Sequence, residues 1–249
     1  MPGEHQQTFQ GFGPKVLDFF KALSFHQSRE WFQENKSIYE SDVKAPFGLL
    51  IADLVAGFER LGIPLTGHPE KSIFRLNRDI RFAKDKSPYK THAGAVLTRD
   101  GSKMAPGMLY IHIAPEGSFA AAAFYHPEPP VLASLRHAIA FSQARWLDVE
   151  ETLRANGLDL SAEEALSRLP KGFDPKEVEK VEHALKLKSL IVQRKLEPAS
   201  LQKAELVAEI VHFTEEARPL LDFGWAAIDK ASGIQEQGTA ARIGKRMKD

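Results

Sequence analysis

The sequence contains no cysteine among its 249 residues. Disulfides, thiolate catalysis, zinc fingers and cysteine-ligated iron–sulfur clusters are therefore excluded. It also lacks a long hydrophobic run, since no stretch approaches the roughly 18 apolar residues that a membrane-spanning helix needs. Residues 1–13 are polar and show no basic start followed by an apolar run, so they do not resemble a signal peptide. We therefore expect a soluble, cytoplasmic protein with no membrane partner.

An excess of charge of one sign is also missing. Lysine plus arginine and aspartate plus glutamate number 33 each, so the formal net charge is zero. A balanced chain has no global electrostatic reason to bind nucleic acid or acidic membranes, and such a role would need a local patch. The sequence has no Walker loop, no G-x-G-x-x-G and no G-x-S-x-G. Dinucleotide-dependent and serine-hydrolase chemistry are therefore unsupported, and we expect no cofactor.

What is present is the composition of an ordinary folded protein, with 43% hydrophobic and 27% charged residues. Apolar residues at helical spacing predict helices at both ends of the chain, and shorter apolar runs between turn residues predict strands in the middle. The predicted helical regions are 16–23, 28–43, 47–58, 132–139, 143–155, 175–185 and 199–230. The predicted strands are Ser72–Leu76, Ala93–Thr98, Met108–Ala114, Ser118–Tyr125 and Ser189–Arg194.

Helices, then a block of strands, then helices again favour an α+β fold rather than an alternating α/β fold. We expect a mainly antiparallel sheet of about four to six strands, flanked by N-terminal and C-terminal helices. No clear linker or repeat is visible, so we expect one domain over residues 14–230. Residues 1–13 are expected to be a flexible leader and residues 231–249 a polar, frayed tail. Pro219 is expected to kink or divide the last helical region.

The most distinctive local feature is residues 71–92, which we call the basic cassette. Seven basic and two acidic residues leave a local excess of +5 in this segment. The basic residues are Lys71, Arg75, Arg78, Arg81, Lys84, Lys86 and Lys90, and the acidic ones are Asp79 and Asp85.

Two interpretations of the basic cassette carry about equal weight. In the first, the segment is an anion site, because the guanidinium fork of arginine matches phosphate and carboxylate groups. In the second, Asp79 and Asp85 neutralise neighbouring arginines and hold the loop as an internal ion-pair clamp. Two aspartates cannot neutralise seven cations, so a net positive surface is expected to remain in either case.

The sequence of the basic cassette also resembles that of a known protein family. Residues 75–92, which read RLNRDIRFAKDKSPYKTH, resemble the signature of the family called domain of unknown function 2461. Residues 29–36 with Tyr39 and Pro46 resemble an earlier block of that family, and residues 169–173 resemble a later one. The similarity extends over about residues 14–225. It implies a family but no reaction. Where that family has a glycine-rich strand this chain has Ala120–Ala123, which weakens any role of such glycines in admitting a ligand.

Several single residues are weaker candidates for a site. Asn35 shares a helical stripe with apolar residues, so its amide is expected either to orient a site residue or to tie the helix to a loop. Tyr89 next to Pro88 is either a stacking surface for a ligand or a packed turn aromatic. His92, His112 and His126 lie at or near three of the predicted strands, but no closely spaced ligand pair supports a metal site, and none is assigned.

These observations leave three functions open. The first is binding of a small anionic or phosphate-bearing ligand, with or without its turnover. The second is association with nucleic acid, which the neutral net charge makes the weaker hypothesis. The third is a structural or interaction domain in which the cassette is only a clamp. Whether the chain is an enzyme and how it oligomerises stay open. The first hypothesis assigns ligand binding to Arg75, Arg78, Arg81, Lys84, Lys86, Tyr89 and Lys90, support to Asp79, Asp85 and Asn35, and acid–base work to His112 or Asp79. The second adds the tail residues Arg242, Lys245, Arg246 and Lys248.

Overall fold

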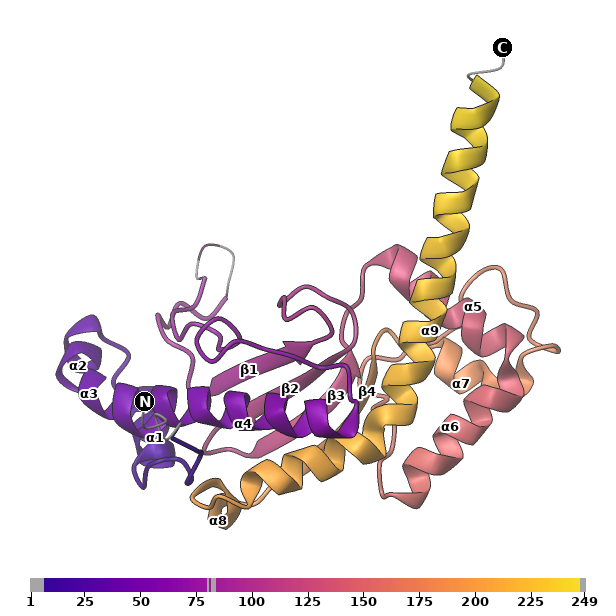
Figure 1. The fold of residues 1–249 in the computed structure, drawn as a ribbon. Coiled ribbons are helices and arrows are strands. Elements are labelled where there is room, and N and C mark those ends of the chain that lie inside the picture. Colours follow the sequence, from indigo (N-terminus) through magenta and orange to yellow (C-terminus); the bar gives the residue numbers. More distant parts are fainter. Residues whose placement is uncertain (1–6, 80, 82–83, 247–249) are drawn as a thin grey trace, which may run out of the picture. The chain divides into compact units, whose positions relative to one another are not determined.

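The computed structural model describes residues 7–246 except 80, 82 and 83, and it describes side chains as far as residue 233 (Figure 1). Internal contacts divide the chain into two compact units. Unit 1 comprises Met1–Ala121 and Gln193–Glu215, and unit 2 comprises Ala122–Val192 and Glu216–Asp249. None of the helices in the described residues is long and apolar enough to cross a membrane.

Helices and strands follow one another in the predicted order. The helices are α1 (Val16–Phe25), α2 (Arg29–Glu34), α3 (Lys36–Ile38), α4 (Ala45–Leu61), α5 (Pro129–Phe141), α6 (Gln143–Ala155), α7 (Glu182–Leu185), α8 (Pro198–Leu201) and α9 (Leu206–Arg246). The strands are β1 (Ala93–Thr98), β2 (Met108–Ile113), β3 (Ser118–Phe124) and β4 (Leu190–Leu196). They form one sheet in the order β1-β2-β3-β4, and β1 and β2 pair antiparallel. The α+β class with an antiparallel sheet and flanking helices is therefore confirmed.

The sheet differs from the prediction at Ser72–Leu76, which forms no named strand. This segment instead makes an isolated bridge between Ile73 and Ala95. Two backbone hydrogen bonds flank the bridge: the Phe74 amide donates to the Gly94 carbonyl at 2.8 Å, and the Val96 amide donates to the Ser72 carbonyl at 3.1 Å. The start of the basic cassette therefore lies along β1 and satisfies part of its edge, which would otherwise expose unpaired backbone groups.

The two faces of the sheet in unit 1 differ in burial. On β2, Leu109, Ile111 and Ile113 are completely buried, whereas Tyr110 and His112 alternate with them and are only half-buried. The buried face belongs to the core of unit 1, which also contains the apolar residues of α4. Ile51 of α4 and Leu97 of β1 lie against the same glycine, Gly67. The half-buried face is the one on which the candidate site is built.

Three prolines lie within helices. Pro46, which separates the predicted helical regions 28–43 and 47–58, lies in the first turn of α4, directly after a π-helical turn at Tyr39–Lys44. A proline is tolerated there because the first N–H groups of a helix have no internal partner. Pro129 likewise begins α5. Pro219 lies inside α9 and does not divide it, although its ring removes one backbone N–H from the helix.

The predicted leader is packed where the structure describes it. Residues 1–6 lie outside the described residues. Phe9 and Phe12 are only 2% and 3% exposed, and the Phe12 amide donates to the carbonyl of Leu201 at 2.8 Å. The Phe9 amide donates to a carboxylate oxygen of Asp53 at 2.8 Å. These contacts hold residues 9–12 in unit 1, where a loose segment was expected. At the other end of the chain the backbone is helical as far as Arg246, within the tail that was expected to be frayed.

Candidate functional site

The basic cassette lies entirely within unit 1 and folds back on itself. The Lys90 amide donates to the Leu76 carbonyl at 2.8 Å, and the Arg78 amide donates to the Pro88 carbonyl at 2.9 Å. Asn77 and Tyr89 form an isolated bridge between these two bonds. These backbone contacts hold the two arms of the cassette together, and the loop between Arg78 and Pro88 connects them.

Two arginine–aspartate pairs occupy this loop. Asp79 accepts two hydrogen bonds from the Arg81 guanidinium, at 2.9 Å and 2.6 Å, and Asp85 pairs with Arg78. Donation from Arg81 lowers the pKa of Asp79, and donation from the Ser87 hydroxyl and amide lowers the pKa of Asp85, with Arg78 adding to it. Both aspartates therefore remain ionised at neutral pH. Asp79 is held in a bidentate pair, which makes it a poor proton acceptor in this arrangement, and its acid–base role stays a prediction.

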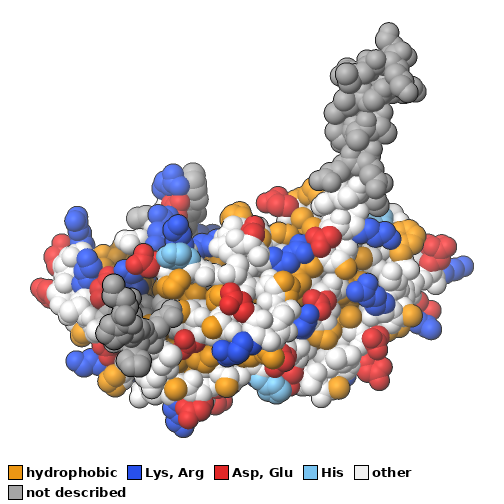
Figure 2. Space-filling model, in the orientation of Figure 1, with side chains coloured by type: hydrophobic (Ala, Val, Ile, Leu, Met, Phe, Trp, Pro, Cys, Tyr) orange, Lys and Arg blue, Asp and Glu red, His pale blue; other side chains and the backbone are white. Residues whose placement is uncertain are grey.

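The remaining cations of the cassette have a different environment. Arg75 is exposed and has no hydrogen-bond or ion-pair partner among the described residues. The ammonium group of Lys90 lies 5.3 Å from the centre of the Phe74 ring. The ammonium group of Lys103 lies 4.7 Å from the same ring and donates to the Ile73 carbonyl at 2.7 Å. Figure 2 shows Lys and Arg side chains gathered beside a histidine in the region of the cassette.

We call Arg75, Arg78, Lys90 and Lys103 the cation cluster. Burial lowers the pKa of Lys90, and the positive charges of Arg75, Lys103 and Arg78 lower it further. Burial also lowers the pKa of Lys103. Neither lysine has a carboxylate within ion-pair distance in the described part of the chain. Among the four cations only Arg78 is paired with a carboxylate in the described part of the chain, so like charges accumulate here, which favours the arrival of an anion.

Two histidines adjoin the cation cluster. The ring centres of His92 and His112 lie 4.4 Å apart, and the Tyr110 hydroxyl and the His112 Nδ1 atom are 3.2 Å apart in a hydrogen bond. Burial, His112, Lys90 and Arg78 together lower the pKa of His92 to about 4. Burial lowers the pKa of His112. Both imidazoles are therefore neutral at neutral pH, and a neutral imidazole can accept a proton.

Gly94 explains how Tyr110 reaches this position. A Cβ atom at residue 94 would lie 2.6 Å from the Tyr110 hydroxyl oxygen, which is closer than real Cβ contacts, and 3.0 Å from a ring carbon, which is a tight contact, so the tyrosine would have to shift. The missing side chain on β1 thus leaves room for the tyrosine of β2 to lie across the neighbouring strand. This local packing positions the Tyr110 hydroxyl beside His112.

The structure does not bring all predicted site residues together. Tyr89 is only 5% exposed, its ring stacks on Phe32 at 4.8 Å, and its amide donates to the side-chain oxygen of Gln27 at 3.0 Å. It therefore anchors the cassette to the helical region and cannot stack on a ligand, so its assignment to ligand binding is corrected. The guanidinium of Arg81 is held by Asp79, and Lys84 and Lys86 are exposed on the loop.

Asn35 forms a local hydrogen bond, and its supporting role in a site stays a prediction. Its side-chain amide donates to the carbonyl of Trp31, four residues earlier, at 2.9 Å. The bond lies within its own helical segment, at the junction of α2 and α3.

The sequence does not predict Lys103 as a site residue, because it lies outside the cassette in a loop whose sequence carries no motif. The side chains of the basic tail lie outside the described residues.

The chain matches a known protein family. The sequence model of a family described as "Conserved hypothetical protein (DUF2461)" matches residues 15–223. The chain belongs to this family. No curated protein and no solved structure matches the chain. The match to the DUF2461 family includes the whole cassette, Lys103 and both histidines, so the candidate site is part of the family's domain.

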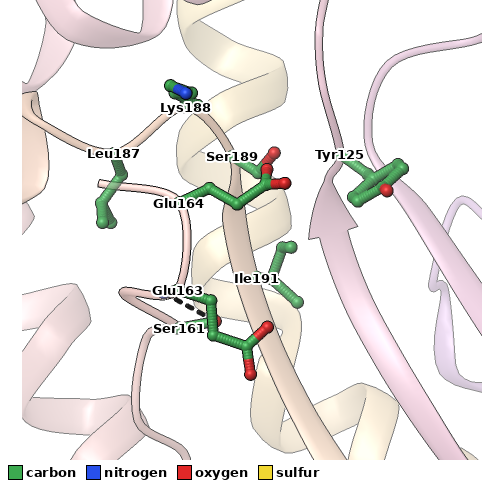
Figure 3. Close-up of a pocket in the computed structure, with 8 residues that line it drawn as sticks. All are labelled: Tyr125, Ser161, Glu163, Glu164, Leu187, Lys188, Ser189 and Ile191. Atoms are coloured by element: carbon green, nitrogen blue, oxygen red, sulfur yellow. Dashed lines mark hydrogen bonds between the residues drawn. The ribbon is translucent and has the colours of Figure 1, made fainter. Parts of the chain in front are cut away.

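The same DUF2461 region contains a hollow in unit 2 that the sequence did not indicate (Figure 3). Its walls carry the carboxylates of Glu163 and Glu164, and Tyr125 lies at one side. Glu164 pairs with His126 at 2.9 Å, so the third histidine considered for a metal site is engaged in this unit. Among the described residues no group of three or more metal-ligating side chains comes together. The hollow contains none of the cassette residues.

Proposed function

We propose that unit 1 binds a small anionic or phosphate-bearing ligand at the cation cluster. The observation that carries the proposal is the placement of Lys90 and Lys103 on one aromatic ring, next to Arg75 and Arg78, without a carboxylate for either lysine among the described residues. Their mutual repulsion is relieved when an anion binds. Charge-assisted hydrogen bonds from such groups contribute about 1.5–3 kcal/mol each.

The members of the cluster have different roles in this proposal. Arg75 presents its guanidinium fork to the ligand, since a fork binds two oxygens of a phosphate or carboxylate at once. Lys90 and Lys103 supply point charges, and the contact with Phe74 positions both ammonium groups. Arg78 is oriented by Asp85. If the ligand is turned over, neutral His112 with its partner His92 is the acid–base group nearest to these cations.

The clamp hypothesis is supported by the pairs Arg78–Asp85 and Arg81–Asp79. These pairs are exposed, and exposed pairs of this kind stabilise a fold only weakly. They do not involve Lys90, Lys103 or Arg75. The clamp and the anion site share Arg78. The Arg81–Asp79 pair belongs to the clamp alone, whereas Arg75, Lys90 and Lys103 belong to the anion site alone, so each can be tested by its own substitution.

The test is a titration with inorganic phosphate at constant ionic strength, followed by isothermal calorimetry and by the thermal unfolding midpoint. We expect saturable binding and a rising midpoint, because a ligand that binds only the native state stabilises it. Lys90→Gln and Arg75→Gln should each weaken binding about tenfold or more, since each removes a charged hydrogen-bonding group. Lys36→Gln, which removes an exposed lysine of α3, should leave binding unchanged.

A substitution in the clamp pair Arg81–Asp79 distinguishes the clamp hypothesis from the anion-site hypothesis. Asp79→Asn should lower stability slightly and leave phosphate affinity within about twofold, because Arg81 is outside the cation cluster. The proposal is wrong if neither inorganic phosphate nor sulfate binds saturably to the wild-type chain, or if Lys36→Gln weakens binding as much as Lys90→Gln does.

A further inference from the structure

Three rings form a column across the sheet in unit 1. Phe119 of β3 stacks on His112 of β2 with ring centres 4.7 Å apart and an angle of 16° between the planes. His112 in turn lies 4.4 Å from His92, which precedes β1. Because β1, β2 and β3 are neighbours in the sheet (Figure 1), the column leads from β3 toward the start of β1, where the cassette ends.

Two further rings connect the column to the cation cluster. Tyr110 lies 6.0 Å from Phe119 and 6.2 Å from Phe74, and Phe74 is the ring that carries the ammonium groups of Lys90 and Lys103. At the other end of the column, the positive charges of Lys90 and Arg78 lower the pKa of His92. The ring contacts through Tyr110 and Phe74 connect the column to Lys90 and Lys103.

This face is not an ordinary apolar core. The five ring-bearing side chains are all half-buried, whereas the alternating residues of β2 on the opposite face are completely buried. The ring-bearing residues are Phe74, His92, Tyr110, His112 and Phe119. Side chains that a core requires only for packing would be expected to be enclosed like Leu109, Ile111 and Ile113 on the opposite face. These rings are fixed by their neighbours and still reach solvent beside unneutralised cations.

We infer that the ligand of the cation cluster carries a planar ring in addition to its phosphate, so that its chemical class is a nucleotide-like phosphate ester. The ring packs against the column of Phe119, His112 and His92, and the phosphate is bound by Arg75, Lys90 and Lys103. Stacking of a base on aromatic side chains is tolerant of base identity, because every base has a π face. This inference rests on the proposed function and adds the class of the ligand.

The test compares four probes by calorimetry at one ionic strength: AMP, ribose 5-phosphate, adenosine and inorganic phosphate. We expect AMP to bind about tenfold more tightly than ribose 5-phosphate, which is the effect of one stacked base. Phe119→Leu removes the ring and retains apolar bulk, and it should abolish the advantage of AMP while binding of ribose 5-phosphate stays unchanged. Phe25→Leu, at a largely exposed phenylalanine of α1, is the matched control and should retain the advantage.

The outcomes separate the inference from the proposed function. Equal affinities for AMP, ribose 5-phosphate and phosphate would overturn the inference and leave the anion site intact, whereas no binding of any phosphate would overturn both. If Phe119→Leu does not fold, His92→Asn removes the ring at the other end of the column and should have the same effect on AMP. A short oligodeoxythymidine that binds more tightly than AMP, with an affinity that falls steeply with salt, would identify a nucleic-acid strand as the source of the ring-bearing phosphate. Without such a difference the source is a free nucleotide.

Discussion

At the scale of single residues, the site depends on charges that the fold holds close together. His92 shows this most clearly, because its pKa falls from an ordinary value of 6.5 to about 4 through burial and through the charges of His112, Lys90 and Arg78. In the unfolded chain these neighbours are dispersed and the imidazole returns to its ordinary behaviour. The unfolded state therefore binds more protons than the native state between about pH 4 and pH 6.5.

This difference predicts both a titration and a stability profile. In an NMR titration His92 should have its midpoint near pH 4, and the free energy of unfolding should fall as the pH is lowered from about 6.5 toward 4, because protons bind preferentially to the unfolded chain. Lys90→Gln should raise the pKa of His92, since it removes a nearby positive charge. Lys36→Gln should not change it, and a midpoint near 6.5 in the wild type would contradict the burial of this ring.

Tyr89 shows a choice between a buried and an exposed ring that reasoning from residues alone leaves open. A tyrosine beside a proline within a charged loop is compatible both with an exposed stacking surface and with a packed turn. The sequence left both open, and the ligand-binding assignment adopted the first. The outcome depended on Phe32, which lies 57 positions away in the sequence and stacks on the Tyr89 ring. Side-chain burial of this kind is decided by long-range contacts, which no local pattern contains.

At the scale of elements, local sequence patterns predicted the boundaries of the four strands closely. The prediction for Ala93–Thr98 matches β1 at both ends, and the predictions for β2, β3 and β4 differ by one or two residues. Alternating burial and turn residues are sufficient for strands of this length. Ser72–Leu76 has the same composition as a strand, but in the described structure it forms only one isolated bridge to β1, between Ile73 and Ala95. Whether such a segment pairs continuously depends on the course of the cassette, which turns away after Phe74.

The start of α2 carries a prediction at this scale. The hydroxyl of Ser28 accepts a hydrogen bond from the Trp31 amide at 3.2 Å and so caps the N-terminus of α2. Ser28→Ala should lower the free energy of unfolding by about 1 kcal/mol, and Ser28→Asp should largely retain it. Urea denaturation measures both. Ser37→Ala, an exposed serine that caps no helix, should change stability by less than about 0.5 kcal/mol, and an equal loss in both variants would contradict the capping role.

At the scale of the whole molecule, the chain was expected to form one domain over residues 14–230, and its contacts divide into two units. The division lies within β3, between Ala121 and Ala122, within β4, between Val192 and Gln193, and within α9. Because the boundaries fall inside regular elements, no linker composition marks them. The extent of the domain remains a prediction, and the candidate site belongs to unit 1 alone.

The packed leader provides a prediction for unit 1 as a whole. Phe12 lies 5.5 Å from Phe9 and 5.4 Å from Phe47 of α4, measured between ring centres, and is almost fully buried. Phe12→Ala should therefore cost about 3–5 kcal/mol of unfolding free energy, which is the usual effect of emptying a buried aromatic site. Met104→Ala, at a methionine that is 87% exposed, should cost less than about 0.5 kcal/mol. Equal midpoints for the two variants in urea would show that the leader is loose after all.

Sequence patterns predicted the α+β class, the order of the elements and the position of a cassette with too many cations for its two aspartates, and the resemblance of three sequence blocks predicted the family. The class and the order follow from local composition and periodicity, which act over a few residues. The tertiary structure shows which cations are paired, that Tyr89 is buried, and that Lys103, His92, His112 and Phe119 join Lys90 on one face of the sheet. Those relations arise from strand register and from loops that return across the sheet, and electrostatic and packing energies depend on distances that the sequence does not contain.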